Sequence, residues 1–310
     1  MAADVTLTLV IPLYNEEVNI QKLFERCTSA LTAWTEAYEI ICINDGSSDK
    51  TLELLKSIHK LDSRWKVISL SRNFGHQQAF LCGLSRATGH LVAMMDGDLQ
   101  DPPELLKKFY ETMQESDCDV VYGIRSKRKE SAFKKLMYQS YYRILKKMAN
   151  IEIPLDSGDF CLMKKEVAFN LVATREQSLF IRGIRSWLGY KQVGYVYERD
   201  ARFGGEPKYT FKKLFQLAYN GIFSFSQMPV KLLTSLGFWV VLISVFYSVY
   251  ALYIKITSPN VPQGFTTLAI AIFFFGGVQL IALGIIGEYV LRIYDETRNR
   301  PLFIEKEVLW

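Results

Sequence analysis

Residues 91–100 read LVAMMDGDLQ, and this stretch decides the fold. Its apolar first half predicts a short buried strand, and two carboxylates, Asp96 and Asp98, follow where that strand ends. Because side chains alternate along an extended chain, Asp96 and Asp98 point to the same side. Two such carboxylates repel each other unless a cation joins them, and Gln100 adds a third, neutral oxygen. Hard oxygen ligands of this kind suit Mg²⁺ or Mn²⁺ held against a diphosphate, whereas the alternative is a pair of solvated acids in a loop.

Other apolar runs alternate with helical patterns on both sides of this strand. Strands are predicted at residues 7–13, 38–43, 67–70 and 120–122, with helices ending near residue 31, over 51–59 and 77–87, and from Pro102 onward. This alternation predicts an α/β fold with right-handed crossovers and a mainly parallel sheet. Ligands of such sheets bind beyond the carboxyl ends of the strands. The polar residues at those ends are Asn15, Glu16, Asp45, Asp49, Asp96, Asp98 and Arg125.

Asp45 follows the second strand and is followed by Gly46, which permits close approach of the backbone. A carboxylate in this position suits the base or ribose of a nucleotide. An Asx-turn that leads into the next helix explains the same residues equally well.

Composition excludes several classes of protein. Hydrophobic residues make up 49% of the 310 residues, which is enough for a packed core and argues against disorder. The five cysteines are scattered, without a Cys-x-x-Cys pair or a Cys/His cluster, so we expect buried reduced thiols in a reducing compartment. Met1–Asp4 lead into a strand pattern, so no signal peptide is expected.

Two segments combine an apolar stripe with basic residues at the remaining positions. The stripes are Phe133, Leu136, Met137, Tyr141, Ile144, Leu145 and Met148, and then Phe211, Leu214, Phe215, Ala218, Tyr219 and Ile222. Basic amphipathic helices rich in Phe and Tyr fit a membrane interface, although packing on the sheet remains an alternative for the first. Nine Lys or Arg and one acid lie between residues 125 and 147, a charge that would attract nucleic acid or anionic lipid. The neighbouring apolar segments favour lipid, so we expect no nucleic-acid partner.

Two charge-free segments, Leu232–Ile254 and Phe265–Gly287, are each 23 residues long. A helix of that length spans roughly 34 Å, enough to cross a bilayer. Lysines precede the first segment and arginines follow the second, so the positive-inside rule places the N-terminal segment and both termini in the cytoplasm. The sequence thus predicts a multi-pass protein of the plasma membrane. Two charge-free core helices of a soluble protein would be the alternative.

Taken together, these motifs resemble the family 2 glycosyltransferases, which have the GT-A fold. The resemblance covers about residues 5–210 and rests on Pro12-Leu13-Tyr14-Asn15-Glu16-Glu17, Asn44-Asp45-Gly46-Ser47-Ser48-Asp49 and Asp96-Gly97-Asp98-Leu99-Gln100. With its apolar C-terminal segments, the chain looks like the polyprenyl-phosphate glycosyltransferases, a group that includes dolichyl-phosphate mannose synthases. Residues 71–77, SRNFGHQ, bring it nearest to the GtrB-type undecaprenyl-phosphate glucosyltransferases.

The resemblance implies a role for each matching position. Pro12, Tyr14, Glu16, Asp45, Asp96, Gly97 and Arg125 would bind the nucleotide-sugar donor. Asp96, Asp98 and Gln100 would ligate Mg²⁺ or Mn²⁺, and Arg202 and Lys208 would hold the phosphate of a polyprenyl phosphate acceptor. A catalytic carboxylate is implied in Leu155–Phe160, where Asp156 fits better and Asp159 is retained. Pro207 stands where relatives usually have Ser, a departure that affects the path of the phosphate-binding loop.

The expected domains are a GT-A glycosyltransferase domain at 1–208, an amphipathic interface helix at 209–230, transmembrane helices at 231–256 and 264–290, and a cytoplasmic tail at 291–310. The expected reaction is inverting transfer of glucose from UDP-glucose to undecaprenyl phosphate. Mannosyl or amino-arabinosyl transfer remains open, and a non-catalytic membrane scaffold is the alternative from another class. His76 is placed near the donor without a role in metal binding, because no second His or Cys lies at ligand spacing. Glycines in the second span permit close helix packing, so a homo-oligomer is allowed.

Overall fold

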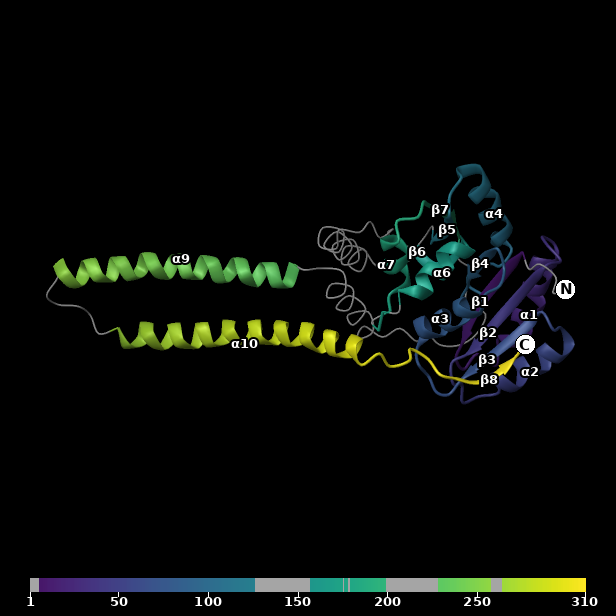
Figure 1. Ribbon diagram of the computed structural model, residues 1–310, viewed down its shortest axis with the longest axis horizontal. Coiled ribbons are helices and arrows are strands. Elements are labelled where there is room, and N and C mark those ends of the chain that lie inside the picture. The colour runs from purple at the N-terminus through teal and green to yellow at the C-terminus, as the bar shows by residue number, and fades with distance from the viewer. Residues whose placement is uncertain (1–5, 126–156, 175, 178, 199–227, 258–263) are drawn as a thin grey trace. The chain divides into compact units, whose positions relative to one another are not determined.

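Figure 1 shows a mixed β-sheet flanked by helices. The computed structural model describes residues 6–125, 157–174, 176–177, 179–198, 228–257 and 264–310. In these residues the sheet has eight strands in the order β7-β5-β6-β4-β1-β2-β3-β8. The strands are β1 Leu7–Leu13, β2 Tyr38–Asn44, β3 Trp65–Leu70, β4 Leu91–Met94, β5 Val120–Arg125, β6 Ser157–Lys164, β7 Gln192–Tyr197 and β8 Glu305–Leu309.

The pairing of the strands confirms a mixed, mainly parallel sheet. Strand β1 pairs in parallel with β2 and β4, β2 pairs in parallel with β3, and β5 pairs in parallel with β7. Two strands that the sequence did not predict run antiparallel: β6 is inserted between β4 and β5, and β8 pairs with β3. Because β6 is antiparallel to β4, its first residues lie at the same edge of the sheet as the carboxyl ends of β1, β2 and β4. Asp159 near the start of β6 therefore reaches that edge.

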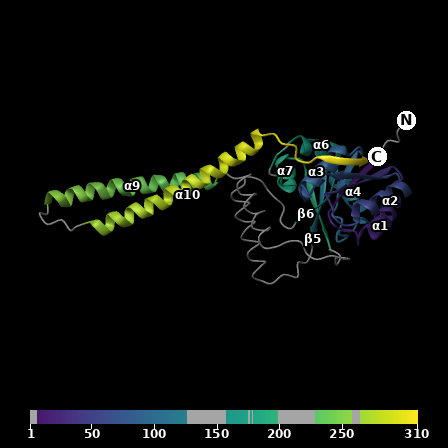
Figure 2. The same cartoon turned by 90° about the horizontal axis from the view of Figure 1, so that it is seen from below.

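Helices cover both faces of the sheet, as Figure 2 shows. They are α1 Ile20–Thr32, α2 Thr51–Leu61, α3 His76–Arg86, α4 Leu105–Ser116, α6 Lys165–Ala173 and α7 Ile181–Trp187. Buried residues of α1, α2 and α4 form one hydrophobic core with alternate residues of the strands. Helix α3 packs on β1 and β2 from the other face, and α6 and α7 contact β6. Helix α4 begins at Leu105, so Pro102 and Pro103 precede it rather than forming its first turn.

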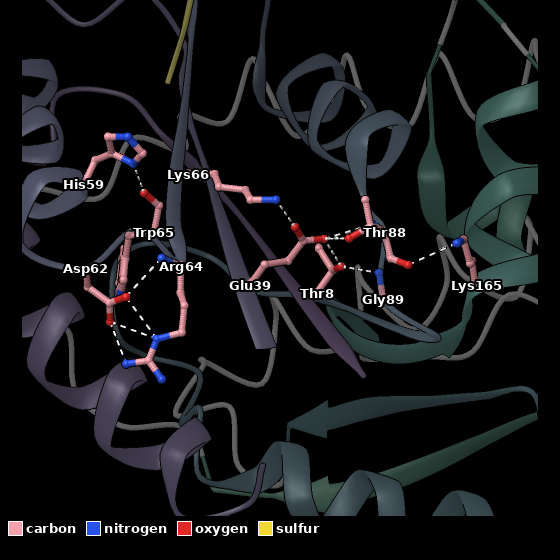
Figure 3. Close-up of polar contacts among 10 residues, drawn as sticks. All are labelled: Thr8, Glu39, His59, Asp62, Arg64, Trp65, Lys66, Thr88, Gly89 and Lys165. Carbon is pink, nitrogen blue, oxygen red and sulfur yellow. Dashed lines mark hydrogen bonds and ion pairs between the residues drawn. The ribbon is translucent and has the colours of Figure 1, made fainter. Parts of the chain in front are cut away.

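A buried polar cluster ties the strands together at their amino ends (Figure 3). The Glu39 carboxylate is 2% exposed and accepts hydrogen bonds from Thr8 at 2.5 Å and from Lys66 at 2.6 Å. It also accepts from the backbone N–H and the hydroxyl of Thr88, at 2.8 and 2.7 Å. Burial favours the neutral acid, but these four hydrogen bonds outweigh it and lower the pKa of Glu39. The polar groups at this end are hydrogen-bonded to one another. The residues expected to bind a ligand lie at the opposite edge of the sheet.

The last strand, β8, comes from the segment expected to be a cytoplasmic tail. Residues 305–309 extend the sheet beyond β3, where Arg86 pairs with Glu305 at 2.7 Å and Lys56 pairs with Glu307 at 2.7 Å. The Lys66 ammonium lies 4.0 Å from the ring centre of Trp310. All five cysteines are buried free thiols, as expected from their apolar surroundings.

A second compact unit contains α9 Met228–Thr257 and α10 Phe265–Thr297, and residues 301–310 belong to the unit that contains the sheet. Within α10, Phe274–Thr297 is 24 residues long with a mean hydropathy of 1.7, so it is long and apolar enough to cross a membrane. In the described part of α9, the corresponding apolar stretch is shorter, Gly237–Tyr247. The second predicted span therefore overlaps a helix that could cross a bilayer, and the first stays a prediction.

Candidate functional site

Loops that follow β1 and β2 lock together at the carboxyl edge of the sheet. The Asn15 side chain accepts a hydrogen bond from the Ser48 backbone at 2.9 Å, and the Asn15 backbone donates to the Ser47 hydroxyl at 3.0 Å. The Glu16 backbone donates to the Thr51 hydroxyl at 3.0 Å. Asn15 takes a positive φ of 52°, a conformation that Asn tolerates better than most residues. Two of the three motifs on which the family resemblance rests thus form one structure.

Asp45 binds the loop between β3 and α3. Its two carboxylate oxygens accept hydrogen bonds from the backbone N–H groups of Phe74, at 2.7 Å, and Gly75, at 3.0 Å. Gly46 has φ of 65°, and a Cβ there would lie 2.4 Å from the backbone carbon of Arg72, so only glycine fits. The structure thus gives Asp45 a part in shaping the site, and its predicted contact with a nucleoside stays a prediction.

Three of the other residues expected to bind the donor lie at the end of β1. Pro12 is buried in the strand, and Tyr14 just beyond it is 38% exposed. A carboxylate oxygen of Glu16 accepts a hydrogen bond from Asn19 at 2.6 Å. An exposed aromatic ring next to a fixed loop is a suitable surface for a flat base.

The acidic motif after β4 packs directly against β1. At Gly97 a Cβ would lie 2.2 Å from Leu13 Cδ2 and 3.3 Å from the Pro12 carbonyl oxygen, so either Leu13 or the loop would have to move to admit a side chain. The Asp98 carboxylate accepts a hydrogen bond from the Gln100 backbone at 3.2 Å, and Leu99 takes a positive φ of 58°. Asp96, Asp98 and Gln100 are all partly exposed, so a cation that arrives with a substrate could reach them.

Asp159 lies beside Asp96 at the same edge. It is 5% exposed, and its carboxylate accepts a hydrogen bond of 2.8 Å from Arg182 Nε. Burial alone would raise the pKa of Asp159, but the charges of Arg182 and His76 outweigh burial and lower it. Asp159 is therefore ionised at neutral pH, which makes it a weak proton acceptor.

Arg125, another of the residues expected to bind the donor, lies at the end of β5. Its Nη2 lies 3.6 Å from a carboxylate oxygen of the fully buried Asp101, and Tyr197 donates to the other oxygen of Asp101 at 2.5 Å. A Cβ at position 158 would lie 3.0 Å from Arg125 Nη2, so Gly158 gives the guanidinium room. Burial would lower the pKa of Arg125, but the charge of Asp101, with a smaller contribution from Asp96, outweighs burial and raises it.

The residues present fit a divalent cation that is bound together with a diphosphate. Within the described residues there is no cluster of three or more His, Cys, Asp or Glu side chains that could hold a metal ion by itself. Asp96 and Asp98 supply two hard carboxylates, and Gln100 supplies an amide oxygen. Mg²⁺ commonly binds through one or two carboxylates, with substrate phosphates and water completing its shell. The site therefore matches a cation whose shell the substrate completes.

Several expected site residues lie outside the described residues. These are Asp156, Arg202 and Lys208, together with both predicted amphipathic helices. The structure instead brings in residues to which the sequence gave no role, namely Gln77, Asp101, Arg182 and Tyr197. His76 was placed near the donor, and it proves to lie 3.1 Å from Asp96. No local sequence pattern marks these four residues, because each meets its hydrogen-bonding partner on another element only after the chain has folded.

Comparisons with known proteins show the family to which the chain is related. A family model described as "Glycosyl transferase family 2" matches residues 8–170. The "Uncharacterized glycosyltransferase YkcC" of Bacillus subtilis is 40% identical over 98% of this chain and 94% of the relative. The "Bactoprenol glucosyl transferase" of Shigella phage SfII is 35% identical over 97% of both chains. The solved mannosyltransferase PcManGT from Pyrobaculum calidifontis, in complex with GDP-Man and Mn²⁺, matches with 14% identity and a TM-score of 0.44, covering 96% of this chain and 88% of that one.

Proposed function

The chain belongs to glycosyl transferase family 2, and we propose that it transfers glucose from UDP-glucose to the phosphate of a polyprenyl (undecaprenyl) lipid. The observation that carries this proposal is the full-length similarity to a bactoprenol glucosyl transferase, at 35% identity over 97% of both chains. The partly exposed acidic motif after β4, together with the cationic Arg125 at the end of β5, supports a donor that carries a diphosphate.

The proposed roles follow from where each side chain lies. Tyr14 and the loops fixed by Asn15 and Asp45 would bind the nucleoside, and Arg125 would contact the diphosphate. Asp96, Asp98 and Gln100 would hold Mg²⁺ or Mn²⁺, which when bound neutralises charge on the departing diphosphate. Arg202 and Lys208 would bind the acceptor phosphate.

The acceptor needs little help from a general base. The second pKa of a phosphate monoester is about 6, so its oxygen is largely ionised at neutral pH. A direct attack by that oxygen on the sugar inverts the anomeric centre and needs no protein nucleophile. Asp159, whose pKa is lowered, would then orient groups around the sugar rather than accept a proton. Asp156 is retained as the other candidate for the catalytic carboxylate.

The pairing of β8 with β3 supports two crossings of the plasma membrane. The chain leaves the α/β unit before α9 and returns to it after α10 to form β8. A single crossing would leave β8 on the opposite side from the sheet to which it is hydrogen-bonded. We therefore propose that α9 crosses the bilayer together with α10. The basic residues that flank the two segments would place the α/β unit and both termini in the cytoplasm.

A donor screen tests the proposal. Purified protein would be incubated with undecaprenyl phosphate, Mn²⁺ and radiolabelled UDP-glucose, and labelled lipid would then be extracted. We expect labelled lipid with the wild type and none with Asp98→Ala. Labelling from a mannose or amino-arabinose donor alone would identify the alternative sugars. Absence of transfer and of nucleotide release with every donor would favour a scaffold.

A further inference from the structure

His76, the first residue of α3, lies between two carboxylates. Its Nε2 atom is 3.1 Å from Asp96 Oδ1 and 3.7 Å from Asp159 Oδ2. The edge of its ring packs against Phe80 one turn later in α3, with 4.7 Å between the ring centres. The imidazole is thus held by its own helix while it contacts both acids.

Asp159 is itself fixed from two directions. Arg182 on α7 donates to Oδ1 at 2.8 Å, and Gln77 on α3 donates to Oδ2 at 3.2 Å. The side-chain oxygen of Gln77 accepts a hydrogen bond of 3.0 Å from the Ile181 backbone, so α3 and α7 are joined next to this carboxylate. A buried carboxylate with partners on two helices cannot rotate without breaking these bonds. Asp159 is therefore a rigid support for whatever contacts it.

We propose that His76 is a positioning residue, which fixes the Asp96 carboxylate for a divalent cation and is supported by Asp159 and Arg182. The inference rests on the proposed function, because it takes Asp96 as a metal ligand. An imidazole on Oδ1 restricts rotation of the Asp96 carboxylate and so determines where Oδ2 points. Groups that orient metal ligands in this way are worth about 10–100-fold in metal affinity or activity.

The position of His76 also explains how Asp96 and Asp159 can both lie next to the same imidazole nitrogen. The charge of Asp96 acts unfavourably on Asp159, whereas His76 and Arg182 act favourably. Without His76, Asp96 would lose its contact on this side and turn away from Asp159. We therefore expect the effect to appear in cation binding before any sugar is transferred.

The test compares His76→Phe with His76→Gln. Phenylalanine keeps an aromatic ring against Phe80 but contacts no carboxylate, whereas Gln keeps an N–H group near the position of Nε2. Binding of Mn²⁺ to the full-length protein would be titrated by electron paramagnetic resonance of the free ion, with and without UDP. We expect the Kd for Mn²⁺ to rise about 10–100-fold in His76→Phe. In His76→Gln it should rise much less.

Asp159→Asn tests whether His76 depends on Asp159 for its position. Mn²⁺ binding is the measurement, because it requires no sugar transfer. This variant should also weaken Mn²⁺ binding, because it removes the charge that supports His76. Unchanged Mn²⁺ affinity in folded His76→Phe, or equal losses in the Phe and Gln variants, would overturn the inference. If His76→Phe lowers the Tm substantially, His76→Ala takes its place in the same comparison. A wild type that binds no Mn²⁺, even with UDP, would instead refute the proposed function.

Discussion

Tyr197 donates a hydrogen bond of 2.5 Å to Asp101, whose side chain is completely buried. The other oxygen of Asp101 faces Arg125 at 3.6 Å. The position of the Arg125 guanidinium is thus set by a buried acid and by a tyrosine from a neighbouring strand.

Tyr197→Phe should misplace Arg125. Removing the hydroxyl takes a donor from a buried carboxylate, a loss of about 1–3 kcal/mol in stability. Because Arg125 is proposed to contact the diphosphate, the KM for the nucleotide sugar should rise several-fold. Thermal unfolding and initial-rate kinetics would measure these effects. Tyr195→Phe is the matched control, since that hydroxyl on the same strand makes no hydrogen bond within the described residues. Equal effects in the two variants would contradict the role of Tyr197.

Removal of the divalent cation should abolish sugar transfer. The acidic motif offers two carboxylates but no complete metal cluster within the described residues, so a chelator should strip the ion readily. Activity should return when Mn²⁺ or Mg²⁺ is added back to the wild type, but not to Asp98→Ala. Full activity in a metal-free buffer would contradict the role of Asp96 and Asp98 as metal ligands.

Gly97→Ala should displace the acidic motif from β1. The new Cβ would meet Leu13 Cδ2 at 2.2 Å, so the loop or the leucine must move. Since Asp96 and Asp98 flank this position, we expect a large loss of kcat with a modest change in Tm. The double variant Leu13→Val/Gly97→Ala lacks the clashing atom and should recover part of the activity. No recovery would place the cause at the Pro12 carbonyl oxygen instead.

Glu39→Gln should destabilise the sheet without touching the site. The Lys66 ammonium would lose its carboxylate partner, and one amide cannot accept all four hydrogen bonds, so we expect a loss of about 1–3 kcal/mol. In the wild type, the folded-state pKa of Glu39 lies below the unfolded value of about 4.3. Its stabilisation is therefore present above that pH and is lost as the pH falls to the folded-state pKa. Unfolding midpoints measured from pH 6 downward should converge for the two proteins, and a constant difference would contradict this account.

Deletion of residues 305–310 should expose the backbone of β3. Unpaired edge strands invite association with other chains. We expect faster hydrogen exchange at the β3 amides and a greater tendency to aggregate, both measurable in detergent. Charge reversal at Glu307, which keeps the strand, is the control and should have a much smaller effect.

The sequence predicts the first strands well because their signals are local. Strand β1 has the predicted bounds, since seven apolar or β-branched residues are buried on both faces. Strand β8 was missed because Glu305, Lys306 and Glu307 give an edge strand a polar composition. Strand β6 was missed because its antiparallel pairing depends on β4, far away in the chain.

The site was predictable where a motif is contiguous and not where it is assembled by the fold. The spacing of Asp96 and Asp98 is visible in sequence, and so is the glycine between them. The contact of Asp159 with Arg182 depends on α7 packing beside β6, which no local pattern encodes. The same holds for Asp45, whose partners lie in the loop after β3.

Strand β8 is the last element of the chain to be synthesised. Its partner β3 therefore keeps one edge open until α9, α10 and residues 305–309 have been synthesised. Long-range pairings of this kind form late and leave intermediates that are prone to misfold. Completion of the sheet is thus tied to synthesis of the segment that follows α10 rather than to completion of the N-terminal segment.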